Sequence, residues 1–153
     1  EVHEADIRSF FTWLKQTNVM TQVILYDVAD VQAWQRLLAS GVIPENKWFL
    51  LFVLGRYSAA QTSSPIDLLP FLNAHDDIYP WAMCAFGPQE NACAMAAASL
   101  GGHARVGFEN NLFLKSGEPA ASNAALVAQV CQGADALGRP LATAHDIRGL
   151  FLN

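Results

Sequence analysis

The sequence contains few charged residues. Asp, Glu, Lys and Arg make up 15% of its 153 residues, against roughly 25% in an ordinary soluble domain, whereas 52% of the residues are hydrophobic. A small domain needs more polar surface than this, so we expect the chain to belong to a larger core or to bury much of its surface against partners. The few cations are scattered and the net charge is −5, which argues against nucleic acid as a partner, because phosphate binding needs clustered Lys and Arg.

Several motifs of binding and targeting are also missing. The three cysteines, Cys84, Cys93 and Cys131, form no Cys-x-x-Cys pair, so we expect them to be small buried side chains in a reducing cytosol. The four histidines form no His-x-His pair. No apolar run reaches the roughly 18 residues of a membrane span, and the first residues resemble no signal or transit peptide. These absences predict a cytoplasmic protein with no membrane contact.

Short apolar runs alternate with segments of helical periodicity. The runs predict four buried strands, near residues 22–27, 48–54, 81–86 and 103–108. Helices are expected over about 4–18, 28–40, 65–73, 89–100 and 122–137, with a short one opening at Thr143. Strands that are apolar on both faces and alternate with helices are typical of a parallel sheet covered by helices.

This alternation predicts an α/β fold with four βα units, in a single domain over residues 1–153. Four units are half of an eight-stranded (β/α)8 barrel, which needs around 250 residues. No Gly-x-Gly-x-x-Gly follows the first strand, so a dinucleotide-binding fold has little support. Half a barrel leaves both edges of its sheet open, in agreement with the excess of apolar residues.

The segment Gly101–Asn111, GGHARVGFENN, combines a predicted strand with charged and amide side chains. Residues two apart share a face of a strand, so we expect Arg105 and Glu109 on one face and Val106 and Phe108 on the other. A buried Arg and a buried Glu are costly unless they are paired, hydrated or bound to a metal. The segment therefore predicts the wall of a site, and a structural ion pair is the alternative interpretation.

Other polar residues follow the predicted strands, at the end where barrel sites form. Asp27 ends the first strand and is expected either to cap the next helix or to contact substrate. Arg56, in the loop after the second strand, is the cation there that could bind a phosphate. We expect Asn111 to cap a loop and His103, at the start of its strand, to have a structural role.

These segments together resemble the β-keto acid cleavage enzyme family. The resemblance rests on GGHARVGFENN at 101–111, ASNAALV at 121–127, LGRPLAT at 137–143, LYD at 25–27 and FVLG at 52–55. It covers essentially the whole chain, but only the C-terminal half of the family's barrel.

The resemblance implies a zinc-dependent (β/α)8 barrel that converts a β-keto acid and acetyl-CoA into acetoacetate and a new acyl-CoA. It implies Glu109 as the zinc-binding carboxylate and Arg105 as the residue that orients the substrate carboxylate or supports catalysis. Arg56 and Asp27 are then candidates for binding the β-keto acid or the CoA ester. The family's other zinc ligands are a His-x-His pair from an early strand, so these are expected outside the chain. Zinc accepts mixed His and carboxylate ligands and polarises a keto oxygen.

One position departs from the family's pattern. Family members commonly have an acid–base Asp directly after the Glu, where this chain has Asn110, and an amide is no general base near neutral pH. Asn110 is therefore a candidate catalytic residue of altered chemistry. Two alternatives stay open: a catalytically silent homologue that acts as a binding or assembly module, and another metal-dependent barrel lyase or aldolase. The missing barrel half or a homo-oligomer is the expected macromolecular partner.

Overall fold

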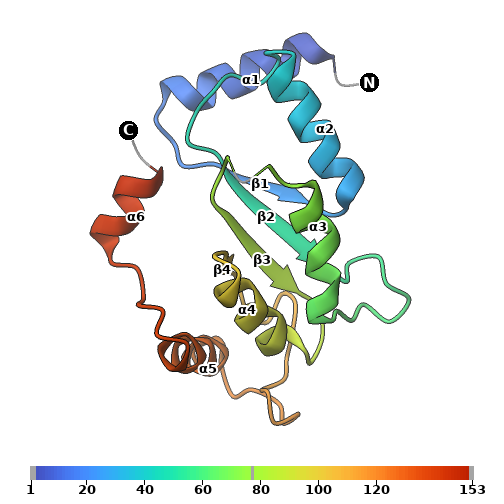
Figure 1. The fold of residues 1–153 in the computed structure, drawn as a ribbon, viewed down its shortest axis with the longest axis vertical. Helices are drawn as coiled ribbons and strands as arrows, with labels where there is room; N and C mark the ends of the chain where they lie inside the picture. The colour runs from blue at the N-terminus through green and yellow to red at the C-terminus, as the bar shows by residue number, and fades with distance from the viewer. Residues whose placement is uncertain (1–2, 77, 152–153) are drawn as a thin grey trace.

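A computed structural model describes residues 3–76 and 78–151 as one parallel sheet with helices around it (Figure 1). The sheet contains β1 (Gln22–Leu25), β2 (Phe49–Leu54), β3 (Trp81–Ala85) and β4 (His103–Ala104), paired in that order. All three pairs of neighbours are parallel. A doubly wound sheet reverses its strand order, whereas this one follows the chain. The predicted α/β fold is confirmed, and it has the architecture of half a (β/α)8 barrel.

Helices separate the strands along the chain. They are α1 (Glu4–Gln16), α2 (Val28–Ala39), the 3-10 turn η1 (Pro65–Leu68) with α3 (Leu69–Ala74), α4 (Glu90–Ser99), α5 (Asn123–Ala136) and α6 (Ala144–Phe151). Asp27 and Ser122 cap α2 and α5, because each side chain accepts a hydrogen bond from a backbone N–H in the first turn. None of the helices within the described ranges is long and apolar enough to cross a membrane.

One face of the sheet packs against the helices. Leu25, Phe52 and Met83 of the strands share the main core cluster with Trp34 of α2 and Ala94 of α4. These strand side chains are 4% exposed or less. Burial of this size is the main favourable contribution to folding, so this helix-covered face fixes the sheet on which the site is built.

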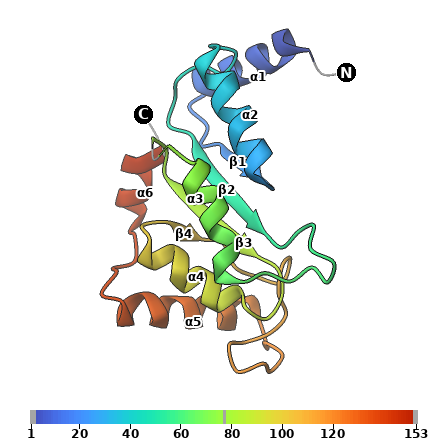
Figure 2. The same cartoon turned by 45° about the vertical axis from the view of Figure 1, so that its right-hand side comes forward.

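The opposite face, which corresponds to the inside of a barrel, carries a smaller cluster. Leu51, Val53 and Cys84 pack there with Phe151 of α6. The ring of Phe151 lies 4.6 Å from that of Phe49, the first residue of β2, and Figures 1 and 2 both show α6 beside the sheet, apart from α3. Helix α6 therefore covers the inner face at the amino ends of the strands.

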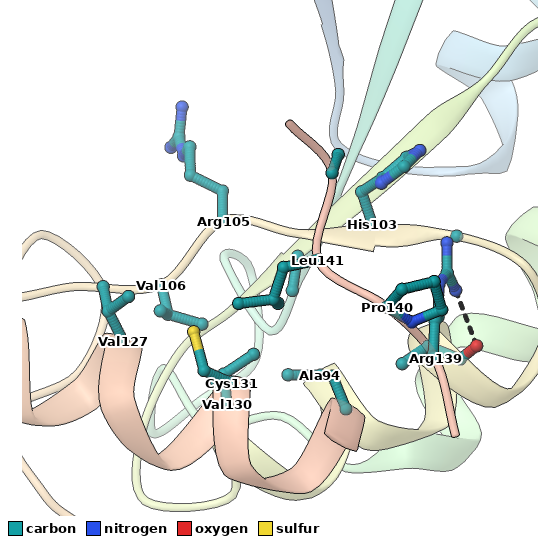
Figure 3. Close-up of a pocket in the computed structure, with 15 residues that line it drawn as sticks. Ala94, His103, Arg105, Val106, Val127, Val130, Cys131, Arg139, Pro140 and Leu141 are labelled. Carbon is teal, nitrogen blue, oxygen red and sulfur yellow. Dashed lines mark hydrogen bonds between the residues drawn. The ribbon is translucent and has the colours of Figure 1, made fainter. Parts of the chain in front are cut away.

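Both edges of the sheet are open, as predicted. On β1, Ile24 is 43% exposed, and Phe10 and Trp13 of the preceding helix are more than half exposed. Beside β4 lies a groove of about 420 Å³ between β4, α5 and residues 139–142. In Figure 3 apolar side chains of α5, including Val127 and Cys131, lie below β4 and line this groove. Part of the apolar excess thus lies at surfaces that this chain leaves uncovered.

The predicted fourth strand is too long. It was expected over residues 103–108, but β4 ends at Ala104. Arg105 N still donates to Met83 O at 2.9 Å, and the chain then turns at Gly107, whose φ is +150°. Val106 packs on the helix-covered core as predicted, whereas Phe108 is 41% exposed, so its predicted placement beside Val106 is wrong. The strand stops because side chains, described below, take the next backbone N–H groups.

Candidate active site

The residues that follow the four strands surround a small pocket of about 120 Å³. Its lining comes from every strand end: Ile24 and Tyr26 at β1, Val53 and Arg56 at β2, Phe86 after β3, and Arg105, Glu109 and Asn110 after β4. Sites of (β/α)8 folds lie at this end of the strands. The structure thus brings together four of the predicted site residues, and we call this depression the mouth pocket.

Arg105 and Glu109 form an ion pair at the mouth pocket. Arg105 Nη2 lies 3.4 Å from Glu109 Oε2, and the two side chains are 37% and 76% exposed. The expectation that both charges are buried is therefore wrong for this chain, because the segment leaves the sheet after Arg105. An exposed pair contributes about 0–1 kcal/mol to stability, so fold stability gives little reason for these two charges.

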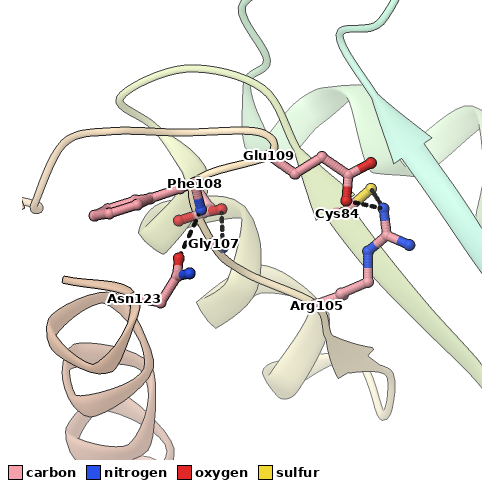
Figure 4. A network of polar contacts seen from close by, with 7 residues as sticks. Cys84, Arg105, Gly107, Phe108, Glu109 and Asn123 are labelled. Carbon is pink, nitrogen blue, oxygen red and sulfur yellow. Dashed lines mark hydrogen bonds and ion pairs between the residues drawn. The ribbon is translucent and has the colours of Figure 1, made fainter.

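The guanidinium of Arg105 also approaches a cysteine of the inner face. Its Nη2 lies 3.8 Å from Cys84 Sγ on β3, and a dashed line marks this contact in Figure 4. Burial raises the pKa of the Cys84 thiol, although Arg105 acts in the opposite direction. The thiol therefore stays protonated at neutral pH and places no negative charge beside the Arg105 guanidinium. Cys84 and Cys93 are buried, as predicted for small apolar side chains, whereas Cys131, predicted to be buried as well, is only half-buried.

Two side chains from outside the segment hold its backbone. Gly107 N donates to Glu90 Oε1 at 3.1 Å. Phe108 N donates to Asn123 Oδ1 at 2.8 Å, and Figure 4 shows Asn123 beside Phe108. Glu90 is fully buried, and its second oxygen accepts from Asn111 Nδ2 at 3.1 Å. Sequence reasoning missed both roles. The available signal for Glu90 was a single charge in an otherwise uncharged, Ala-rich helix.

The two asparagines of the segment have different environments. Asn111 is 3% exposed, and its side chain both accepts from Phe113 N and donates to Phe113 O, which confirms its predicted role as a loop cap. Asn110 is held through its backbone, since its carbonyl accepts from Gly87 N at 3.1 Å. Asn110 is also one of the residues that line the mouth pocket.

The remaining candidate residues are Asp27, Arg56 and His103. Asp27 Oδ1 accepts from Asp30 N at 2.9 Å, so the capping role is confirmed, and contact with substrate stays a prediction. Arg56 lies over the ring of Phe86, 5.6 Å from its centroid. His103 lines the groove beside β4 instead. Burial and the nearby Arg139 lower its pKa, which agrees with a structural role.

Glu90 predicts a specific pH dependence of stability. Burial raises its pKa above the ordinary value of 4.5, and the hydrogen bonds from Asn111 and Gly107 only partly oppose this. The native state therefore binds this proton more tightly than the unfolded chain, so the stabilisation from protonation is complete below the unfolded pKa and is lost as pH rises through the native one. Denaturant unfolding from pH 7 down to pH 4 should show that the free energy of unfolding of wild type rises relative to that of Glu90→Gln as the pH falls. A difference that is constant with pH would contradict the raised pKa.

A metal ion needs more ligands than this part of the chain supplies. Across residues 3–76 and 78–151, no three His, Cys, Asp or Glu side chains lie close enough to hold a metal ion. The Glu109 carboxylate is accessible and can supply one ligand. These residues do not form a zinc site by themselves, since protein zinc sites use three or four ligands.

Comparison with known proteins identifies the family. The sequence profile of the beta-keto acid cleavage enzymes matches residues 1–152. The chain belongs to the β-keto acid cleavage enzyme family. The match confirms the resemblance carried by GGHARVGFENN.

Several curated proteins are similar to this chain in sequence. A 3-keto-5-aminohexanoate cleavage enzyme from Acetoanaerobium sticklandii is 31% identical over 95% of this chain and 52% of its own length. One from Fusobacterium nucleatum is 30% identical over 97% of this chain and 53% of its own length. A 3-oxoadipate:acetyl-CoA acetyltransferase from Cupriavidus necator is 40% identical over 46% of this chain and 25% of its own length. The chain thus spans about half the length of the first two relatives.

Proposed function

We propose that the protein cleaves a β-keto acid with acetyl-CoA as the acyl acceptor. The bond between the keto carbon and the methylene carbon breaks. The methylene carboxylate takes the acetyl group as the acetyl thioester bond to CoA breaks, which gives acetoacetate. The released acyl group forms a new thioester with the same CoA sulfur. The observation that carries this proposal is the pairing of Arg105 with Glu109 at the mouth of a half barrel that belongs to this family. Names of the relatives, which refer to cleavage of keto acids and to acetyl-CoA, support it.

Arg105 has the chemistry to bind the carboxylate of the β-keto acid. Its guanidinium presents a rigid fork of donors that matches a carboxylate. The present partner, Glu109, is a weak competitor because it is exposed and its oxygen lies 3.4 Å away. We assign the binding of the substrate carboxylate to Arg105. Arg56 lines the same pocket, and we assign to Arg56 and to Asp27, which follows β1, contacts with the rest of the substrate or with the CoA ester.

Zinc enters this proposal through Glu109. We propose that Glu109 supplies one ligand and that residues outside this chain supply the others, because the described residues do not complete a site. Bound zinc would act as a Lewis acid toward the keto oxygen. Metal analysis of the intact protein tests this assignment, since wild type should retain zinc through dialysis and Glu109→Gln should lose it.

The open edges of the sheet point to a partner. We propose that strands of the barrel half absent from this chain pair with β1 and β4, because the chain spans about half of its relatives and carries an apolar groove beside β4. A homo-oligomer in which a second copy supplies these strands is the other outcome, which mass measurement in solution would detect. We place the protein in the reducing cytosol, because its three cysteines are free thiols.

Asn110 favours a second candidate function. An amide cannot accept a proton near neutral pH, so a catalytically silent homologue that binds or assembles is the competing interpretation. The assay for both is acetoacetate formation by the intact protein from acetyl-CoA and a panel of β-keto acids. Formation of acetoacetate supports the cleavage enzyme, substrate binding without turnover supports the silent homologue, and cleavage without any acyl-CoA indicates a lyase.

The Asn110→Asp variant measures how much the amide limits the reaction. General acid–base catalysis contributes about 10²- to 10⁴-fold, so Asp at this position should raise the rate of acetoacetate formation by about tenfold or more. The substitution leaves the hydrogen bond from Gly87 N to the backbone carbonyl of residue 110 available. Asn110→Ala serves as the control and should not raise the rate. Equal rates for wild type and Asn110→Asp would show that the amide at this position does not limit the reaction.

A further inference from the structure

Two backbone N–H groups in the middle of segment 105–111 donate to side chains of neighbouring helices. Gly107 N donates to Glu90 Oε1, and Phe108 N donates to Asn123 Oδ1. Glu90 is the first residue of α4, and Asn123 is the first residue of α5. We propose that Glu90 and Asn123, the acceptor pair, are positioning residues that hold Glu109 and Asn110 in place relative to Arg105. This inference rests on the proposed function, since it concerns the geometry of that site.

Glu90, the first member of the acceptor pair, is buried against the segment. The carboxylate is fully buried, and a buried carboxylate is costly unless hydrogen bonds satisfy it. One oxygen accepts from Gly107 N and the other from Asn111 Nδ2. Asn111 cannot turn its amide without losing both hydrogen bonds to Phe113. Both oxygens of Glu90 are therefore matched to donors of the segment, and displacement of the segment would leave them unsatisfied.

The position of Asn123, the other member of the acceptor pair, explains why residue 107 is a glycine. A Cβ built on Gly107 would lie 3.0 Å from Asn123 Oδ1, closer than ordinary van der Waals contact. Gly107 also has a φ of +150°, which other residues rarely adopt. The segment therefore comes close to α5 at the residue where it leaves the sheet, and the hydrogen bond from Phe108 N fixes that turn.

The acceptor pair holds the part of the segment that follows Arg105, and it does not hold Arg105 itself. Arg105 is positioned independently, because its backbone N donates to Met83 O of β3 at 2.9 Å. Glu109 and Asn110 follow the turn, so their positions depend on Gly107 and Phe108 together with the hydrogen bond from Gly87 N to Asn110 O. Loss of the acceptor pair should leave the binding of the substrate carboxylate at Arg105 intact and displace the groups beyond it. Displacement by about 1 Å can lower a rate by 10²-fold.

The test compares Asn123→Ala with Asn123→Asp in the intact protein, with 3-keto-5-aminohexanoate and 3-oxoadipate as probes alongside acetyl-CoA. Asn123→Ala should lower kcat by about 10- to 100-fold, with little change in KM for the keto acid. Asn123→Asp keeps an acceptor oxygen and should retain most of the wild-type kcat. Glu90→Ala should act like Asn123→Ala. Val31→Ala, a fully buried change in α2, controls for destabilisation and should leave kcat per folded molecule unchanged.

Amide hydrogen exchange decides the inference separately from activity. The amides of Gly107 and Phe108 should be protected in wild type and in Val31→Ala, whereas the Phe108 amide should lose protection in Asn123→Ala and the Gly107 amide in Glu90→Ala. If the wild-type protein produces no acetoacetate, the proposed function is wrong. This exchange pattern would still support the role of the acceptor pair. Unchanged protection in the Ala variants would overturn it. So would lost protection with kcat at the wild-type value, or a rise in KM alone.

Discussion

Arg105→Met should lower kcat/KM for the β-keto acid by about 10²- to 10⁴-fold, because each hydrogen bond to a charged group contributes about 1.5–3 kcal/mol and the fork supplies two of them. Most of the loss should appear as a higher KM, since the carboxylate is present in both the ground state and the transition state. Initial rates of acetoacetate formation at varied keto acid concentration measure the two parameters separately.

The stability of the same variant provides its control. The Arg105–Glu109 pair is exposed, so its loss should change the free energy of unfolding by only about 0–1 kcal/mol. Arg105→Lys keeps the charge but not the fork, and its kcat/KM should lie between those of wild type and Arg105→Met. An unchanged KM with a reduced kcat would assign Arg105 to the chemical step and not to binding of the carboxylate.

The meeting of these residues at one pocket could be predicted from the sequence. FLLFVL at β2 and WAMCA at β3 are apolar on both faces, which only a sheet covered on both sides accommodates. Once the strands are parallel, the residues after Leu54 and Ala85 must lie at the same end as Arg105. Local patterns were sufficient here because the site follows from strand direction alone.

The path of the chain after Arg105 could not be predicted in the same way. Alternation assumes that backbone N–H groups find a neighbouring strand, but Gly107 and Phe108 donate to side chains 17 and 15 residues away in the sequence. Nothing in the local sequence shows this competition. The exposure of Glu109 was also missed, because burial was inferred for a strand wall whereas this residue lies beyond the strand. Sequence reasoning therefore placed the candidate residues at one end of the sheet but misjudged their burial and the loop that carries them.

Gly102→Ala should lower the free energy of unfolding by about 2–3 kcal/mol, because it overpacks the start of β4. A Cβ built on Gly102 would lie 2.1 Å from Trp81 Cζ3. The Trp81 ring cannot easily move, since it is 6% exposed and stacks on Phe52 at 5.5 Å between ring centroids. Gly102 N also donates to Ala97 O at 2.9 Å, so the backbone is held from the other side.

Gly149→Ala is the matched control for this prediction. A Cβ on Gly149 meets nothing within 4 Å, and the residue lies in α6, where Ala is favoured over Gly by about 0.5–1 kcal/mol. Denaturant unfolding should therefore show Gly149→Ala at or above wild-type stability and Gly102→Ala well below it. In the double variant Gly102→Ala, Trp81→Leu, the smaller side chain removes the overlap, so the two changes should cost less together than the sum of their separate costs. Additive costs would mean that the Trp81 ring is not what excludes a side chain at residue 102, and the close packing of β4 on β3 that places Arg105 would need another origin.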